Sequence, residues 1–188
     1  QEALQSFWFL HLCLQIDSNG HSMSPGRFDQ YTWRCYCNSI KAGQSREDME
    51  ELLGCLWIKF TEIGKLRDHM GSLDFGGYPM FQNLLVGGTD SLGNDATNDV
   101  SLLCCKVTGE LKLSQPSLSV RWHRNSSEEL KRAAAEVARS GIGMPAYFND
   151  EAIVPILRNI GCSKAEALDY CEVGCVEPHV AGRMEGMY

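Results

Sequence analysis

Three short apolar segments, separated by longer stretches with helical patterns, constrain the fold of this chain most. They are "NLLVGG" (83–88), "SLSVRW" (117–122) and "MPAYFN" (144–149), and each is bounded by glycine, proline or asparagine. Short runs of apolar, β-branched or aromatic residues with such boundaries are typical of strands. Because helical patterns lie between them, we expect buried strands of a parallel sheet. The sequence therefore predicts an α/β fold.

Helix-start signals precede several of the helical stretches. Ser45 stands three residues before Asp48, the spacing of a capping box, in which each side chain accepts a hydrogen bond from the other residue's backbone N–H. The same spacing, a serine followed by a glutamate, recurs at 126–129 and 163–166. After Ser45, apolar residues recur on one helical face: Met49, Leu52, Leu53, Leu56 and Phe60. We expect a helix after each of these serines.

The first forty residues predict two helices joined by a turn. The most apolar stretch of the chain, residues 7–16, is interrupted by His11 and is too short and too polar to span a bilayer, so we expect a buried helix. Residues 19–26, "NGHSMSPG", are rich in turn formers, and a second helix is expected from Arg27 to Ile40. The turn is therefore expected to be held between two helices.

Composition and charge narrow the class of protein. Of 188 residues, 44% are hydrophobic and 22% are charged, which is typical of globular proteins. The 24 acidic residues against 17 basic ones give a net charge of −7, whereas nucleic acids and anionic membranes attract clustered positive charge. We expect neither as a partner. Residues 1–188 are expected to form a single unit, and the start at Gln-Glu, without an initiator methionine, predicts a truncated sequence and no secretion signal.

The nine cysteines predict reduced thiols. Their odd number, in a chain too large to need disulfides, favours a cytoplasmic protein. Cys55, Cys104 and Cys105 stand inside apolar runs, where cysteine is usually a small core residue, and we expect all three to be buried there.

Two stretches resemble metal or phosphate sites but lack the full patterns. Cys171, Cys175 and His179 stand four residues apart and would line one face of a helix, but Pro178 is expected to end any helix near Gly174, so no metal site is predicted.

The second stretch is residues 86–99, "VGGTDSLGNDATND". It has neither the Gly-Lys-Ser/Thr of a phosphate loop nor the acid spacing of an EF-hand. It predicts a connection from a strand to a helix, with Asn94 or Asp95 as the cap of that helix.

Cys175 and Glu177 flank the single residue Val176. If Val176 is extended, the two side chains project to the same side, with Cα atoms about 6 to 7 Å apart. That span suits two neighbouring atoms of one small substrate. The same letters would also arise from a surface glutamate beside a core cysteine, so the spacing leaves both interpretations open.

Long phrases in order along the chain resemble glycyl radical enzymes. These phrases are "FWFLHLCLQIDSNGHSMSPGRFDQY" (7–31), "GGTDSLGNDATND" (87–99), "QPSLSVRW" (115–122) and "YCEVGCVEP" (170–178). The single cysteine in "GCVEP" resembles the dehydratase and lyase branch, such as glycerol dehydratase and choline trimethylamine-lyase. Pyruvate formate-lyase proper carries two adjacent cysteines, and Gly174 takes the place of the first.

The resemblance implies a fold and residue roles. The family fold is a ten-stranded α/β barrel with the cysteine loop at its centre, and this helix-rich chain would be a central part of it. Cys175 would be the thiyl radical that takes a hydrogen atom from substrate carbon, and Glu177 the base that removes the neighbouring hydroxyl proton. His21 and Ser22 match the pair that holds substrate hydroxyls in members similar to glycerol dehydratase.

The resemblance also implies what lies outside this chain. We expect no metal and no directly bound cofactor here. The radical glycine would belong to an absent C-terminal domain, and an S-adenosylmethionine activase with an iron–sulfur cluster would install its radical. The complete enzyme would be a homodimer of anaerobic cytoplasm acting on a small hydroxylated substrate, and the fragment alone would be inactive. The alternatives are formate C-acetyltransferase activity and a non-catalytic redox or metal-binding remnant of such an enzyme.

Overall fold

The computed structural model describes residues 1–17, 22–64, 66, 68–75 and 80–183. The elements in chain order are α1 (Glu2–Asp17), β1 (Gly26–Arg27), α2 (Phe28–Lys41), α3 (Arg46–Glu62), α4 (His69–Phe75), β2 (Asn83–Gly87), α5 (Asp99–Leu111), β3 (Ser117–Trp122), α6 (Glu128–Arg139), β4 (Ala146–Asn149), α7 (Asp150–Asn159), α8 (Lys164–Leu168), β5 (Cys171–Val173) and β6 (Glu177–His179).

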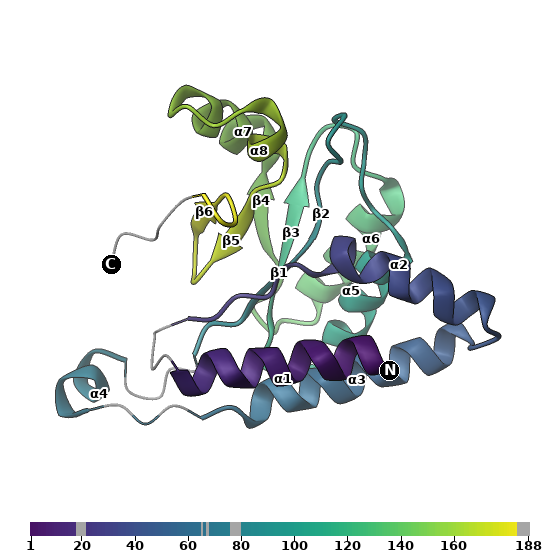
Figure 1. Cartoon of the computed structure of the whole chain (residues 1–188), viewed down its shortest axis with the longest axis vertical. Helices are drawn as coiled ribbons and strands as arrows, with labels where there is room; N and C mark the ends of the chain where they lie inside the picture. The colour runs from purple at the N-terminus through teal and green to yellow at the C-terminus, as the bar shows by residue number, and fades with distance from the viewer. Residues whose placement is uncertain (18–21, 65, 67, 76–79, 184–188) are drawn as a thin grey trace.

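Four parallel strands form the central sheet (Figure 1). Their order, β1-β2-β3-β4, is their order along the chain, and the register pairs Gly26 with Leu84, Leu84 with Leu118, and Val120 with Tyr147. Parallel neighbours in sequential order, joined by helical connections, are the arrangement found in the walls of α/β barrels. The three predicted strands and their parallel pairing are confirmed, but the predicted burial holds only for β2 and β3, since Phe148 is the one buried residue of β4. β1, with two residues, is too short to carry a sequence pattern.

Helices α2, α3, α5 and α6 cover one face of the sheet. In Figure 1 the helices α5 and α6 lie on one side of the strands, and the hairpin of β5 and β6 lies on the other. Ser119 and Arg121 occupy alternate positions of β3 and face away from the helices, as strand geometry requires. The intervening positions of β2 and β3 belong to the core that the sheet shares with the helices: Leu84, Val86, Leu118 and Val120.

Two of the predicted capping boxes are confirmed, at the starts of α3 and α8. Ser45 and Asp48 exchange backbone hydrogen bonds at 2.8 and 3.0 Å, and Ser163 and Glu166 form the same arrangement. The apolar face predicted for α3 packs into the core as expected, with four residues buried and Leu52 partly buried: Met49, Leu53, Leu56 and Phe60.

Two predicted helix starts were wrong by one to four residues. Ser127 rather than Ser126 caps α6, because the Ser126 hydroxyl accepts a backbone N–H of the preceding turn. Asn98 rather than Asn94 or Asp95 caps α5, because residues 90–95 close a hydrogen-bonded loop of their own. In both cases the side chain expected to cap the helix makes hydrogen bonds within the preceding loop instead.

Helix α1 is less buried than we expected. One side packs on α3, where the Trp8 and Phe60 rings meet edge to face, and His11 Nε2 lies 2.8 Å from Oε1 of the buried Gln82. The expectation of a buried helix was wrong because the opposite side exposes large apolar residues: Phe9, Leu10, Leu14 and Ile16. Within the described residues, no helix combines the length and apolar character that crossing a membrane requires.

The cysteines in apolar runs differ in their surroundings. Cys104 and Cys105 are fully buried, as predicted, and burial raises the pKa of both thiols, that of Cys105 to about 12. The prediction for Cys55 was wrong, because α3 turns Leu53 and Leu56 toward the core and leaves Cys55 exposed.

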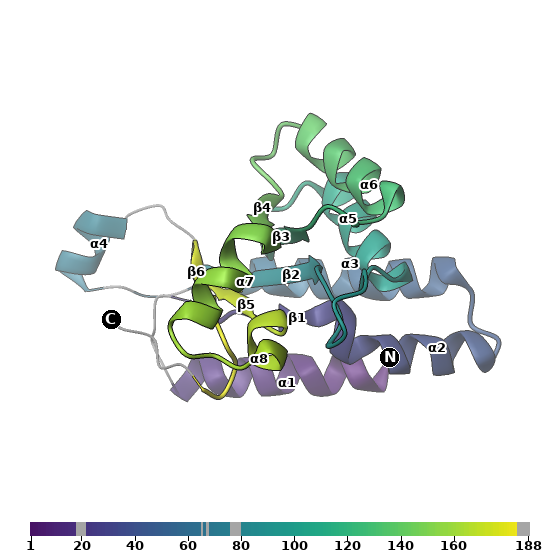
Figure 2. The same cartoon turned by 90° about the horizontal axis from the view of Figure 1, so that it is seen from above.

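The C-terminal elements lie on the face of the sheet opposite the helices (Figure 2). β5 and β6 form an antiparallel hairpin, and β5 packs on β1 and β2. Arg27 of β1 ties this region to the sheet, since its Nη1 donates to Oδ1 of Asp169 at 2.6 Å and its Nη2 donates to the carbonyl of Thr89 at 2.8 Å. A second, smaller core holds α7 and α8 to the hairpin: Leu157, Cys162, Ala167, Tyr170 and Val180.

Candidate active site

Cys175 lies in the turn of the β5–β6 hairpin. Val173 pairs with Glu177, and residues 174–176 reverse the chain between them. No helix forms around Cys175, in agreement with the expected effect of Pro178, and Val176 lies in the turn, so the condition of an extended Val176 is not met. Gly174 has φ +61°, in the left-handed region that glycine adopts without strain, and it allows this three-residue turn.

Both predicted catalytic side chains belong to this turn. Cys175 is its middle residue and is half-buried, and Glu177 is half-buried at the start of β6. Glu177 Oε2 accepts a hydrogen bond from the N–H of Val176 at 3.1 Å. The carboxylate therefore folds back over the turn that carries the thiol. The structure brings these two side chains onto one element, and their catalytic roles stay predictions.

The Ser22 hydroxyl also reaches this turn. A Cβ atom built on Gly174 would lie 2.7 Å from Glu177 Oε2 and 3.4 Å from Ser22 Oγ. At the shorter distance, a side chain at position 174 would displace the Glu177 carboxylate. The Glu177 carboxylate and the Ser22 hydroxyl therefore both lie on the side of Gly174 where a side chain would project. His21, the other predicted substrate-binding residue, lies outside the described residues.

A fully buried arginine anchors the base of the hairpin. Arg121 of β3 donates through Nε and Nη2 to the two carboxylate oxygens of Asp150, both at 2.8 Å, and through Nη1 to the carbonyls of Leu168 and Tyr170 at 3.0 Å. Its guanidinium lies 3.9 Å from the centre of the Tyr170 ring. Such complete pairing is what makes a buried charge tolerable. Arg121 thus holds the chain entering β5 against the sheet.

The second glycine of "VGG" belongs to the same arrangement. Gly88 has φ +77°, and a Cβ at this position would lie 2.5 Å from Nε of Arg121. The backbone therefore approaches the guanidinium more closely than any other residue type allows. A sequence signal for this network is the arginine inside a predicted buried strand.

Glu172 is a second acidic side chain of the hairpin, and it faces inward. It is fully buried, and neither of its oxygens has a hydrogen-bond partner among the described residues. Burial raises the pKa of its carboxyl to about 8, the charge of Arg121 lowers it, and the charges of Glu177 and Asp150 raise it further. Because a buried carboxyl is much less destabilising when neutral, we expect Glu172 to carry a proton at neutral pH.

The variant Glu172→Gln is expected to stabilise the protein as the pH rises. The folded-state pKa of about 8 lies above the ordinary value of 4.5, so the carboxyl contributes its full stability below pH 4.5 and loses it between there and about pH 8, by at most about 1.4 kcal/mol per pH unit. Glutamine does not ionise. The thermal unfolding midpoints of the complete protein and its variant should agree near pH 4.5 and separate toward pH 8. A difference that is independent of pH would contradict the raised pKa.

The helix that would align Cys171, Cys175 and His179 does not form. Cys171 and His179 pair across the open end of the hairpin, while Cys175 lies at the turn. In the part of the chain that the structure describes, no three histidine, cysteine or acidic side chains are placed to hold a metal ion. Burial raises the pKa of the Cys171 thiol, which disfavours the thiolate that a metal would need.

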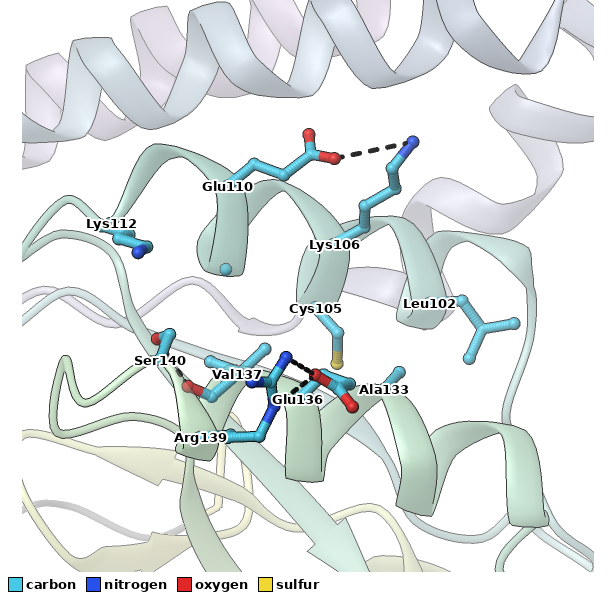
Figure 3. A pocket seen from close by; sticks show the side chains of 11 residues that line it. Leu102, Cys105, Lys106, Glu110, Lys112, Ala133, Glu136, Val137, Arg139 and Ser140 are labelled. Atoms are coloured by element: carbon cyan, nitrogen blue, oxygen red, sulfur yellow. Dashed lines mark hydrogen bonds and ion pairs between the residues drawn. The ribbon is translucent and has the colours of Figure 1, made fainter.

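A groove of about 560 Å³ lies between α5 and α6, away from the hairpin (Figure 3). Two ion pairs lie in its walls, Lys106 with Glu110 at 3.8 Å and Arg139 with Glu136 at 2.7 Å, and Lys112 lines it as well. Cys105 lies in its wall as a buried thiol. The groove belongs to the outer helical layer and offers no reactive group, so the hairpin turn is the better candidate site.

Solved structures match this fold closely. A glycerol-bound B12-independent glycerol dehydratase from Clostridium butyricum is 48% identical, with a TM-score of 0.94 over 98% of this chain and 23% of that chain. A structure that concerns 1,2-propanediol dehydration in Roseburia inulinivorans is 49% identical, with a TM-score of 0.93 over 96% of this chain and 23% of that chain. The sheet, its helices and the hairpin are therefore part of a larger fold.

A family model described as pyruvate formate lyase-like matches residues 1–188. The chain belongs to this family of glycyl radical enzymes. Among curated relatives of this glycyl radical enzyme chain, "Probable dehydratase YbiW" of Escherichia coli (strain K12) is 39% identical over 97% of the chain, and (2S)-3-sulfopropanediol dehydratase of Klebsiella oxytoca is 36% identical over all of it. The chain spans 23% of the length of each.

These comparisons confirm the family, the dehydratase and lyase branch, and the α/β fragment that the sequence predicted. Within the glycyl radical enzyme chain, the structure adds residues around the cysteine turn that sequence reasoning had missed. Glu172 and Arg121 lie beneath it, and Ser24 and Asn83 make hydrogen bonds to Gly174.

Proposed function

We propose that this chain supplies the thiol and the base of a glycyl radical dehydratase or lyase. The complete enzyme eliminates a leaving group from a small hydroxylated substrate such as a diol, an amino alcohol, a hydroxyproline or a sulfonate. The observation that carries the proposal is that Cys175 and the Glu177 carboxylate share one tight turn, with the Ser22 hydroxyl beside it. Relatives named as dehydratases support the reaction class.

In this proposal Cys175 exchanges a hydrogen atom with the substrate. As a thiyl radical, its sulfur takes the atom from the substrate carbon that bears the hydroxyl, so a C–H bond breaks and an S–H bond forms. The last step reverses this, because the product radical takes the atom back and the thiyl radical is restored. A half-buried thiol at a turn suits the role, whereas Cys104 and Cys105 are sealed in the core.

Glu177 moves the proton. Its carboxylate removes the proton of the hydroxyl on the radical carbon, and the resulting ketyl radical anion carries negative charge that helps to break the bond to the leaving group on the next carbon. The protonated Glu177 then returns the proton to the departing group, so that a diol yields an aldehyde and water. Ser22 and His21 are proposed to hold the substrate hydroxyls during these steps.

In the family, a glycyl radical elsewhere in the complete protein supplies the first oxidation of the thiol, after an S-adenosylmethionine activase with an iron–sulfur cluster has installed it. The position of Cys175 fits a reaction with a glycyl radical, because Cys175 lies in a turn and is only half-buried, so that another segment of the complete protein could approach its sulfur. We propose the same dependence here, together with a homodimer that acts in anaerobic cytoplasm.

Gly174 weighs against formate C-acetyltransferase activity. That reaction requires a second cysteine directly before the loop cysteine in the family pattern, and residue 174 occupies this place. A side chain there would meet Glu177 Oε2 at 2.7 Å and would need the left-handed backbone at φ +61°. The turn is therefore built around glycine and a carboxylate rather than around two sulfurs.

The experiment that tests the function is anaerobic turnover by the complete, activated protein. A panel of propanediol, glycerol, an amino alcohol, hydroxyproline and hydroxylated sulfonates is offered, and carbonyl products or released sulfite are measured. Elimination from at least one class is expected. Formation of formate from pyruvate and coenzyme A, with no elimination product from the panel, would replace this proposal with the acetyltransferase alternative.

A further inference from the structure

Two side chains from distant segments hold the peptide groups of Gly174. Ser24 Oγ accepts a hydrogen bond from the Gly174 N–H at 3.2 Å, and Asn83 Nδ2 donates to the Gly174 carbonyl at 3.2 Å. Ser24 Oγ also accepts from the Asn83 N–H at 3.4 Å. The three residues therefore form a closed set of contacts, which we call the Gly174 clamp, on the residue directly before Cys175.

The clamp is mounted on the rigid part of the fold. Asn83 begins β2, is 2% exposed and pairs with Ser117 of β3. Ser24 lies two residues after the bridge that Ser22 forms with Phe81, the segment just before β2. Both clamp side chains are therefore fixed by the parallel sheet rather than by the hairpin.

The hairpin needs such an external support. Each of its strands has three residues, and a two-stranded hairpin of this size is marginal by itself. Gly174 has no side chain with which to pack, so its position depends on the bonds to its backbone. Hydrogen-atom transfer requires close and well-oriented contact between sulfur and substrate carbon, and a displacement of about 1 Å is costly to the rate.

We propose that Ser24 and Asn83 are positioning residues that fix the thiol of Cys175 through their hold on both peptide groups of Gly174. The inference rests on the proposed function of Cys175. In this role neither side chain touches the reacting atoms. Each acts through the backbone of Gly174, whose φ of +61° favours glycine.

The first test asks whether Ser24 and Asn83 fix the backbone of Gly174, and it does not depend on radical chemistry. Hydrogen exchange of the hairpin amides, residues 171–176, is measured by mass spectrometry on the complete protein before activation. Ser24→Ala and Asn83→Leu are expected to exchange faster than wild type, because the Gly174 peptide groups lose an acceptor or a donor. Ser119→Ala is the matched control, since the Ser119 hydroxyl is buried on the same face of the sheet without a partner among the described residues.

The second test concerns positioning. In the activated protein, Ser24→Ala is expected to lower kcat per glycyl radical by about tenfold, the effect of about one hydrogen bond, with KM changed less than about twofold. Ser24→Thr keeps the hydroxyl and should restore most of the rate. A merely structural role would lower the radical yield or the unfolding temperature and leave the turnover per radical unchanged.

The outcomes separate the two proposals. Unchanged exchange in Ser24→Ala, or normal turnover per radical in that variant, overturns the positioning role. An equal loss of turnover in Ser119→Ala overturns it as well. If exchange rises as expected but wild-type protein turns over no substrate, the hold on Gly174 stands and the proposed function fails.

Discussion

Cys175→Ser in the complete, activated enzyme is expected to abolish turnover while the glycyl radical remains at its wild-type level. An O–H bond is stronger than an S–H bond, so a serine oxygen is not oxidised to a radical that could exchange a hydrogen atom with substrate carbon. A loss of about 10⁴-fold or more is expected, as for other enzymes that lose the reacting side chain. Radical content is counted by electron paramagnetic resonance, and product is measured anaerobically in the same sample.

The matched control is Cys171→Ser. Cys171 is half-buried in the same hairpin, but its sulfur faces Gly26, where a Cβ would lie 3.7 Å away, and it is not in the turn. This variant should retain most of the turnover. Equal loss in both variants would mean that the hairpin tolerates no change at either thiol, and normal turnover by Cys175→Ser would remove the thiol from the reaction.

The sheet was predictable from the sequence and the hairpin was not, for a physical reason. β2 is buried at every position and β3 at four consecutive positions, because both lie inside the parallel sheet, and short segments with apolar or aromatic residues between glycine, proline and asparagine marked all three predicted strands. β5 and β6 have three residues each, with glutamate and proline among them, and show no period. Their conformation follows from contacts such as those of Arg121, which the local sequence does not contain.

The site was predictable in part. The spacing of Cys175 and Glu177 left two interpretations open, and the structure places both residues in one hairpin turn rather than along an extended strand. Ser24 and Asn83 stand 150 and 91 positions from Gly174, so only the folded chain shows their contacts. The complete burial of Glu172 was not predictable either, because glutamate is almost always exposed unless it is paired.

Glu177→Gln in the activated enzyme is expected to lower elimination by about 10²- to 10⁴-fold, the usual contribution of a general base, with radical formation intact. The amide oxygen can still accept the N–H of Val176, so the turn should keep its shape while the base is lost. Hydrogen-atom exchange at Cys175 should also survive, because it needs no proton acceptor. Recovered substrate should therefore gain deuterium when the variant is activated in heavy water, although product formation has nearly stopped.

The control for this variant lies in the same hairpin. Glu172→Gln makes the same chemical change five residues earlier, but burial raises the pKa of that carboxyl to about 8, so at pH 7 the side chain is already neutral and the amide replaces it with little change. Its turnover at pH 7 should stay near wild type. Normal turnover by Glu177→Gln would remove Glu177 from the proton transfer, and equal loss in both variants would assign the effect to the hairpin's packing. The predicted contrast arises because one carboxylate folds over the cysteine turn, while the other is enclosed beneath it.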